Sequence, residues 1–137
     1  MALIKKFDHV SIAVKDMDKA LDYYINVLGG EIKTPKFLDS EMGFKFYWCD
    51  FMLGGVKIEL VQPLDENDPI ARYMKKHGEG LHHISLQVED IKEALRKLEE
   101  DGSELLDKNV EGDGWKWAYI SPKDSFGALI QLWEKND

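Results

Sequence analysis

Two histidines with the same neighbours are the first candidates for chemistry in this sequence. The stretch Phe7-Asp8-His9-Val10-Ser11-Ile12-Ala13-Val14 aligns without a gap with Leu81-His82-His83-Ile84-Ser85-Leu86-Gln87-Val88, so that His9 falls on His83. The alignment continues through three further identities: Asp16/Asp90, Ala20/Ala94 and Leu21/Leu95. A solenoid needs at least three units. We therefore interpret the chain as two copies of one module.

The end of each module carries a polar residue among apolar ones. Gly55-Val56-Lys57-Ile58-Glu59-Leu60 aligns with Gly127-Ala128-Leu129-Ile130-Gln131-Leu132, which makes Glu59 and Gln131 equivalent. Burying an unpaired carboxylate is costly, and a divalent cation is a suitable partner for it. If the modules pack with approximate two-fold symmetry, His9, Glu59, His83 and Gln131 converge.

Two imidazoles, one carboxylate and one amide oxygen suit one divalent ion of Zn, Co, Ni, Mn or Fe, with positions left open for substrate. Taken singly, each of these four residues is more often structural than a ligand, and their symmetric recurrence is what favours a metal site. The other two histidines have no equivalents. We expect His77 at the surface, and His82 facing outward or supporting a ligand from behind.

The elements that must position these residues follow from apolar periodicity and from turn residues. Module one, about 5–62, is predicted to contain a strand at 7–14, a helix at 17–28, and strands at 31–37, 44–51 and 56–61, with a loop at 39–43. The connector, 63–80, contains a short helix at 69–76. Module two, 81–135, is predicted to contain a strand at 81–88, a helix at 91–100, and strands at 103–110, 115–120 and 126–133. We therefore expect one α+β domain, 1–137, built from two βαβββ modules.

Composition limits the class of protein and its partners. The net charge is −8 with dispersed acidic residues, which argues against nucleic acid because phosphate binding needs a basic face. No apolar run approaches the ~20 residues that span a bilayer. The single cysteine, Cys49, and a start without an apolar signal segment favour the cytoplasm.

Several motifs resemble those of a known superfamily. They are Asp8–Val14, Ile58–Leu64, Asp68-Pro69-Ile70-Ala71, Gly80-Leu81-His82-His83-Ile84 and Ser121-Pro122-Lys123-Asp124. Together they resemble the vicinal oxygen chelate superfamily, which includes glyoxalase I and extradiol dioxygenases, and within it most closely the methylmalonyl-CoA epimerases. The resemblance implies paired βαβββ modules that form an open, cupped mixed sheet around a metal, often in a homodimer. It also implies metal ligands at His9, Glu59, His83 and Gln131.

The resemblance further implies an epimerase that inverts a carbon between a thioester and a carboxylate. A metal stabilises the enolate in such a reaction, and two groups exchange the proton on opposite faces of the carbon. Relatives use one glutamate before the third strand, which matches Glu41, and another near the end of the second module. This chain has Gln131 at the second position, and glutamine exchanges no proton at neutral pH. We hypothesise that Glu59 takes the missing role.

Other side chains fit an acyl-CoA substrate. An aromatic lining that excludes water would strengthen the electrostatics of proton abstraction. The candidates are Phe44, Phe46, Trp48, Trp115 and Trp117, each of which also fits an ordinary aromatic core. Cations for the coenzyme A phosphates could come from Lys36, Lys45, Lys57 and Lys123.

Three alternatives remain open beside the metal-dependent epimerase. One is a glyoxalase-type isomerase or a lyase that acts on another chelating substrate. The second is an Fe(II) dioxygenase, because without Gln131 the site has two His and one carboxylate. The third is a non-catalytic protein of the same fold that binds a small molecule, since one scaffold hosts many chemistries.

Overall fold

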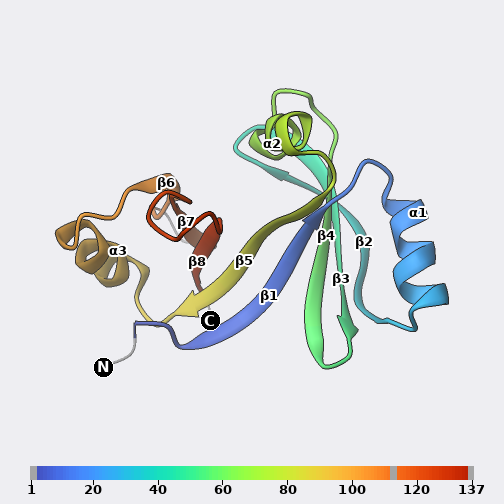
Figure 1. Ribbon diagram of the computed structural model, residues 1–137, viewed down its shortest axis with the longest axis horizontal. Helices are drawn as coiled ribbons and strands as arrows, with labels where there is room; N and C mark the ends of the chain where they lie inside the picture. The colour runs from blue at the N-terminus through green and yellow to red at the C-terminus, as the bar shows by residue number, and fades with distance from the viewer. Residues whose placement is uncertain (1–2, 112–113, 136–137) are drawn as a thin grey trace. The chain divides into compact units, whose positions relative to one another are not determined.

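The computed structural model describes residues 3–111 and 114–135, which fall into two compact units (Figure 1). We call residues 9–82 the N-terminal unit. The C-terminal unit comprises residues 83–137 together with the first eight residues of the chain. Among the described residues, each helix is too short or too polar to cross a lipid bilayer.

The N-terminal unit follows the predicted βαβββ order. Its elements are the part of β1 (Lys6–Ala13) from His9 onward, α1 (Met17–Leu21), the π-helix η1 (Asp22–Val27), β2 (Glu31–Glu41), β3 (Phe44–Leu53), β4 (Val56–Pro63) and α2 (Pro69–His77). The strands lie in the order β2-β3-β4-β1. β4 pairs antiparallel with β3 and parallel with β1.

One face of these strands is apolar and packs against α1, which lies alongside them in Figure 1. Alternation along β4 directs Ile58 and Leu60 to this face and Glu59 to the other. The core members are Val14, Met17, Cys49, Phe51, Ile58 and Leu60. The opposite face carries Glu59 together with aromatic side chains of β3.

The N-terminus of helix α1 is fixed by two specific contacts. Asp16 caps its first turn, because its carboxylate accepts the Lys19 N–H at 3.2 Å. Gln62, on β4, accepts the Met17 N–H at 2.9 Å. After η1 the chain passes close to the core at Gly30, where a Cβ would lie 3.1 Å from the Phe51 ring and 3.0 Å from a backbone oxygen. A side chain at this position would push the helix off the sheet.

The C-terminal unit repeats this plan. Its elements are the part of β5 (Gly80–Val88) from His83 onward, α3 (Ile91–Glu100), β6 (Leu105–Asn109), β7 (Lys116–Ile120) and β8 (Ile130–Glu134), in the strand order β5-β8-β7-β6. β5 and β8 are parallel, like β1 and β4. The apolar side of α3 packs against a second core: Val88, Ile91, Ala94, Leu95, Ala118 and Leu132.

The start of the chain belongs with this second core. Leu3 and Ile4 pack against it, and the Lys5 N–H donates to the Gln87 carbonyl oxygen at 2.8 Å. Residues 3–8 therefore stabilise the C-terminal unit, although they precede the N-terminal unit in sequence.

The α+β class and the repeated βαβββ order are confirmed, and four element boundaries are corrected. The predicted loop at 39–43 is wrong, because β2 continues to Glu41 and only Met42 and Gly43, both at positive φ, form the turn. The helix predicted at 17–28 becomes a π-helix after Leu21. The last strand begins at Ile130 and not at 126, since residues 122–127 form turns. β6 is shorter than predicted, with an irregular register and a positive φ at Asp107.

Candidate functional site

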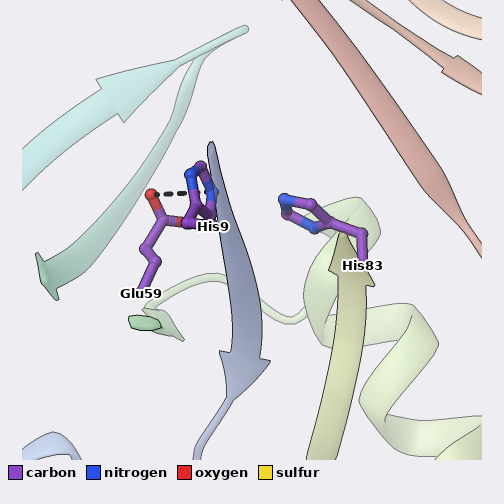
Figure 2. Close-up of side chains that lie close together, drawn as sticks. All are labelled: His9, Glu59 and His83. Carbon is purple, nitrogen blue, oxygen red and sulfur yellow. Dashed lines mark ion pairs between the residues drawn. The ribbon is translucent and has the colours of Figure 1, made fainter. Parts of the chain in front are cut away.

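In the N-terminal unit, a histidine and a glutamate lie together on the polar face of the sheet. Ser11 is directly opposite Glu59 in the parallel β1–β4 ladder, and His9 shares the face of Ser11 because it is two residues away. His9 Nε2 lies 3.7 Å from Glu59 Oε2, the pair joined by the dashed line in Figure 2. Their side chains are 12% and 23% exposed, so both are largely shielded from water.

A serine fixes the other oxygen of this carboxylate. Ser11 is completely buried, and its Oγ donates to Glu59 Oε1 at 3.2 Å. The two oxygens of Glu59 are thus differentiated, one held by a hydroxyl group and the other directed at an imidazole. The carboxylate oxygen Oε2 of Glu59 and the imidazole nitrogen Nε2 of His9 therefore lie side by side, as two ligand atoms of a metal would.

The C-terminal unit builds the same constellation with a neutral amide. Ser85, also completely buried, lies directly opposite Gln131 in the β5–β8 ladder and donates to Gln131 Oε1 at 2.9 Å. Gln131 Nε2 donates to the Tyr119 hydroxyl at 3.3 Å. His83, also drawn in Figure 2, is 6% exposed and meets the Tyr119 ring edge-on at a centroid distance of 5.4 Å.

The two ladders confirm the equivalence that the sequence alignment predicted. Each histidine stands two residues before a buried serine, and each serine lies opposite the polar residue of the closing strand. The equivalence survives the late start of β8, because the register and not the length of the strand places Gln131. The same geometry therefore carries a carboxylate in one unit and an amide in the other.

Glu41 stands at the end of β2 rather than in a loop, paired with Phe44. Alternation places it on the face that holds Asp39, Phe46 and Trp48. The residue is exposed as a whole, yet protein around the carboxyl group withdraws solvent from it. This desolvation raises the pKa of Glu41 to about 7, and the negative charges of Asp39, Glu59 and Asp68 add to the effect. A carboxyl group with such a pKa exchanges protons readily near neutrality.

His82 is not outward-facing, which corrects that part of the prediction. Its side chain is buried, with 7% exposure, and lies edge-on to the Tyr73 ring at 4.7 Å. Burial lowers the pKa of His82 to about 4, with a smaller contribution from His77. His77 itself is exposed, as expected, and its ring stacks on the Tyr73 ring at a centroid distance of 4.2 Å. The imidazole of His82 is therefore neutral at physiological pH.

The predicted aromatic candidates divide between the two units. In the N-terminal unit, Phe44, Phe46 and Trp48 share the face of Glu41. In the C-terminal unit, Trp117 alternates with the buried core residue Ala118 and so shares the face of Tyr119. Trp115 is 58% exposed and packs on Trp133 at 5.1 Å.

Three of the four candidate lysines already have a carboxylate nearby. Lys36 contacts Asp18 at 3.3 Å and lies 4.3 Å above the Tyr47 ring. The ammonium groups of Lys57 and Lys123 lie 3.6 Å from Asp50 and 3.3 Å from Glu104, respectively.

Sequence reasoning overlooked two residues that the structure places beside the ladder positions. Asp50, 8% exposed, lies directly opposite Glu59 in the β3–β4 ladder, and Tyr119 lies directly opposite Gln131 in the β7–β8 ladder. The signal for Asp50 was an acidic residue in the aromatic strand 44–51. Tyr119 carries no such signal, because a tyrosine is ordinary in a strand.

Comparison with known proteins identifies relatives over nearly the whole chain. The family model described as Glyoxalase/Bleomycin resistance protein/Dioxygenase superfamily matches residues 8–119. The ethylmalonyl-CoA/methylmalonyl-CoA epimerase of Cereibacter sphaeroides is 35% identical over 95% of this chain and 98% of its own. An uncharacterised Bacillus subtilis protein, YqjC, is 32% identical over 96% of this chain and 93% of its own.

A solved structure supports the fold. The methylmalonyl-CoA epimerase of Mycobacterium tuberculosis superposes with a TM-score of 0.82 at 28% identity, and covers all of this chain and 92% of its own. The predicted glyoxalase-like α+β fold is thereby confirmed, together with the predicted similarity to methylmalonyl-CoA epimerases.

Proposed function

Because the chain belongs to the Glyoxalase/Bleomycin resistance protein/Dioxygenase superfamily, we propose that it is a metal-dependent epimerase of an acyl-CoA thioester. The reaction moves a proton at the carbon between a thioester and a carboxylate, as in methylmalonyl-CoA. The relatives named for epimerases support this class of reaction. The observation that carries the proposal is Glu41, whose carboxyl group shares a sheet face with aromatic rings and has a pKa raised to about 7.

We propose that His9, Glu59, His83 and Gln131 hold one divalent metal ion. The first three have the donor types of such a site, and Gln131 adds a neutral oxygen. The chemistry of this donor set fits Zn, Co, Ni, Mn or Fe(II), since imidazole and carboxylate ligands bind all of them. When bound, the ion would supply electrophilic stabilisation of the negative charge that develops on the substrate oxygens.

In this proposal, Glu41 accepts the proton from the reacting carbon on one side. Its pKa near neutrality leaves a large share of the group ionised and ready to accept, and the same value allows it to return the proton. Phe44, Phe46 and Trp48 lie on the same face, and in this proposal they shield the reacting carbon from water. The aromatic surroundings therefore strengthen the electrostatic interactions of the reacting carbon.

We propose Glu59 for the proton on the other side. Ser11 holds Oε1, which leaves Oε2 to act beside His9. Gln131 has no proton to exchange, and Glu59 is the carboxylate at the equivalent place in the repeat. The competing interpretation is that Glu59 only binds the metal. Measuring α-proton exchange of the substrate in the Glu59→Gln variant distinguishes the two roles.

One observation favours a second candidate function. The Gln131 amide is hydrogen-bonded at both ends, to Ser85 and to Tyr119. If it does not bind metal, two imidazoles and one carboxylate remain, the set that non-haem Fe(II) oxygenases use. The protein would then be an Fe(II) dioxygenase rather than an epimerase, and its substrate would chelate the metal through two adjacent oxygen atoms.

The test is α-proton exchange of methylmalonyl-CoA in deuterated water. The protein is stripped of metal, assayed, and assayed again after it is reloaded with cobalt or zinc. The epimerase proposal predicts exchange only in the reloaded protein. Absence of exchange in protein that holds one tightly bound metal per chain would overturn it and favour another chelating substrate.

A further inference from the structure

A second carboxylate stands beside Glu41 on the same face of the hairpin. Asp39 is two residues before Glu41 on β2, and it pairs with Phe46 where Glu41 pairs with Phe44. Residues two apart on a strand lie on one face. Asp39 is half-buried, so its charge is less screened than that of a fully exposed aspartate.

The Asp39 carboxylate is held in place by two donors. The Trp48 indole N–H donates to Oδ2 at 3.0 Å, and the Ser40 backbone N–H donates to Oδ1 at 2.8 Å. Trp48 is itself held by Phe37, whose ring meets the indole at a centroid distance of 6.1 Å. The indole therefore fixes a charge next to Glu41 with little freedom to move.

The charged groups that act on Glu41 come from three elements. Asp39 lies on β2, Glu59 on β4, and Asp68 at the N-terminus of α2, and all three raise the pKa of Glu41 after the larger effect of desolvation. Asp68 is buried and caps α2 through the Ile70 N–H at 2.8 Å. Lys45, the nearest cation along β3, pairs with Ser40 and so alternates to the other face. Asp39 is the one of the three acidic groups that neither caps a helix nor stands among the proposed ligands.

We propose that Asp39, held by the indole N–H of Trp48, is a positioning residue that sets the proton affinity of Glu41 for catalysis. The inference rests on the proposed function of Glu41 as the proton acceptor. It assigns the charge to Asp39 and the placement of that charge to Trp48. Neither residue touches the reacting carbon in this account.

The experiment compares Asp39→Asn with wild type in two measurements. The first is a ¹³C NMR titration of the Glu41 carboxyl group in metal-free protein, and the second is the pH profile of α-proton exchange in the reloaded enzyme. Asparagine keeps an acceptor for the indole and removes the charge. We expect the Glu41 pKa and the acid limb of the profile to fall together by about half a pH unit, the size that Coulomb's law gives for charges ~6 Å apart in water.

Two further variants separate charge from placement. Asp107→Asn, an exposed site in the C-terminal unit, changes the net charge equally and is expected to leave both readouts unchanged. Trp48→Phe keeps an aromatic ring but loses the donor that holds Asp39, so the Glu41 pKa and the acid limb are expected to fall in the same direction as in Asp39→Asn but by less, while KM is unchanged. An Asp39→Asn protein with unchanged Glu41 pKa and acid limb would overturn the proposal. A shifted Glu41 pKa in a wild-type protein that shows no exchange would instead overturn the proposed function and leave the tuning intact.

Discussion

The two units build the same hydrogen bonds around different chemical groups. In each unit, a completely buried serine donates across a parallel ladder, Ser11 to Glu59 and Ser85 to Gln131. The scaffold is therefore repeated, while the charge is not. The comparison indicates that the repeated strand pairing fixes where the polar side chain stands, and that the residue type at that position sets its charge.

The same contrast extends to the helices and to the residues across the ladders. Asp16 and Asp90 cap α1 and α3 with nearly identical geometry. Gln62 and Glu134 repeat the contact from the closing strand to the first helical N–H, at 2.9 and 3.0 Å. The residue on the adjacent antiparallel strand differs, since Asp50 lies opposite Glu59 and Tyr119 lies opposite Gln131. The two carboxylates that we propose to exchange the substrate proton, Glu41 and Glu59, both lie in the N-terminal unit.

The largest expected effect comes from removing Glu41, the proton acceptor that we propose in the N-terminal unit. Glu41→Gln is expected to reduce α-proton exchange at least ~100-fold, because general base catalysis contributes ~10²–10⁴-fold. Metal binding should be unchanged, as measured by cobalt titration. In wild type, exchange is expected to rise with pH as Glu41 loses its proton near pH 7. Glu31→Gln, at an exposed site on the same strand, is the control. Exchange that persists in Glu41→Gln would remove Glu41 from the mechanism.

The second prediction exchanges the side chains that distinguish the units. Glu59→Gln is expected to abolish exchange, because the site then lacks the second proton-carrying group, and to weaken metal binding. The double variant Glu59→Gln/Gln131→Glu returns one carboxylate to the site, in the other unit. We expect it to regain metal affinity, measured by cobalt titration, to within ~10-fold of wild type. Retained exchange in Glu59→Gln would show that Glu59 is a ligand only.

The third prediction compares the two buried serines. Ser11→Ala is expected to reduce the free energy of unfolding by ~1.5–3 kcal/mol because its hydrogen bond reaches a charged group, and Ser85→Ala by ~0.5–1.5 kcal/mol because its partner is neutral. Urea unfolding of metal-free protein measures both. Equal losses in the free energy of unfolding would contradict the expectation that Ser11 donates to a charged group and Ser85 to a neutral one.

The smallest effects are expected at two exposed turns, one in each unit. Met42 has a φ of 54° and is 62% exposed, while Phe126 has a φ of 59° and projects fully into solvent. Asparagine tolerates this left-handed region better than an apolar side chain. Met42→Asn and Phe126→Asn are each expected to stabilise the protein by ~0.5–1 kcal/mol. Calorimetry should show raised melting temperatures, and a lowered value would place the original side chain in a stabilising contact.

Much of this arrangement was predictable because a repeat supplies its own alignment. The equivalence of Glu59 and Gln131 followed from residue types alone, and the ladder registers bear it out. Helix α3 was predicted at its observed bounds, since Asp90 caps it and its apolar spacing is regular. Periodicity is strongest over such elements, where one face packs on a sheet.

The remainder depended on pairing across strands, which no local pattern encodes. The loop expected around Glu41 became strand because β3 pairs with β2 as far as that residue. Asp50 and Tyr119 acquired their places only through the partner strand. His82 is buried because Tyr73, on the connector helix, covers it.

The most direct test of the account is a cobalt(II) titration followed by NMR of the histidine rings. The chain has four histidines, and the exposed His77 serves as the internal control. The account predicts saturation at one cobalt per chain, with the rings of His9 and His83 both paramagnetically shifted and broadened in the same proportion as exchange is restored. Cobalt that shifts only one of these two histidines, or none, would contradict the proposal that His9 and His83 bind the same metal ion.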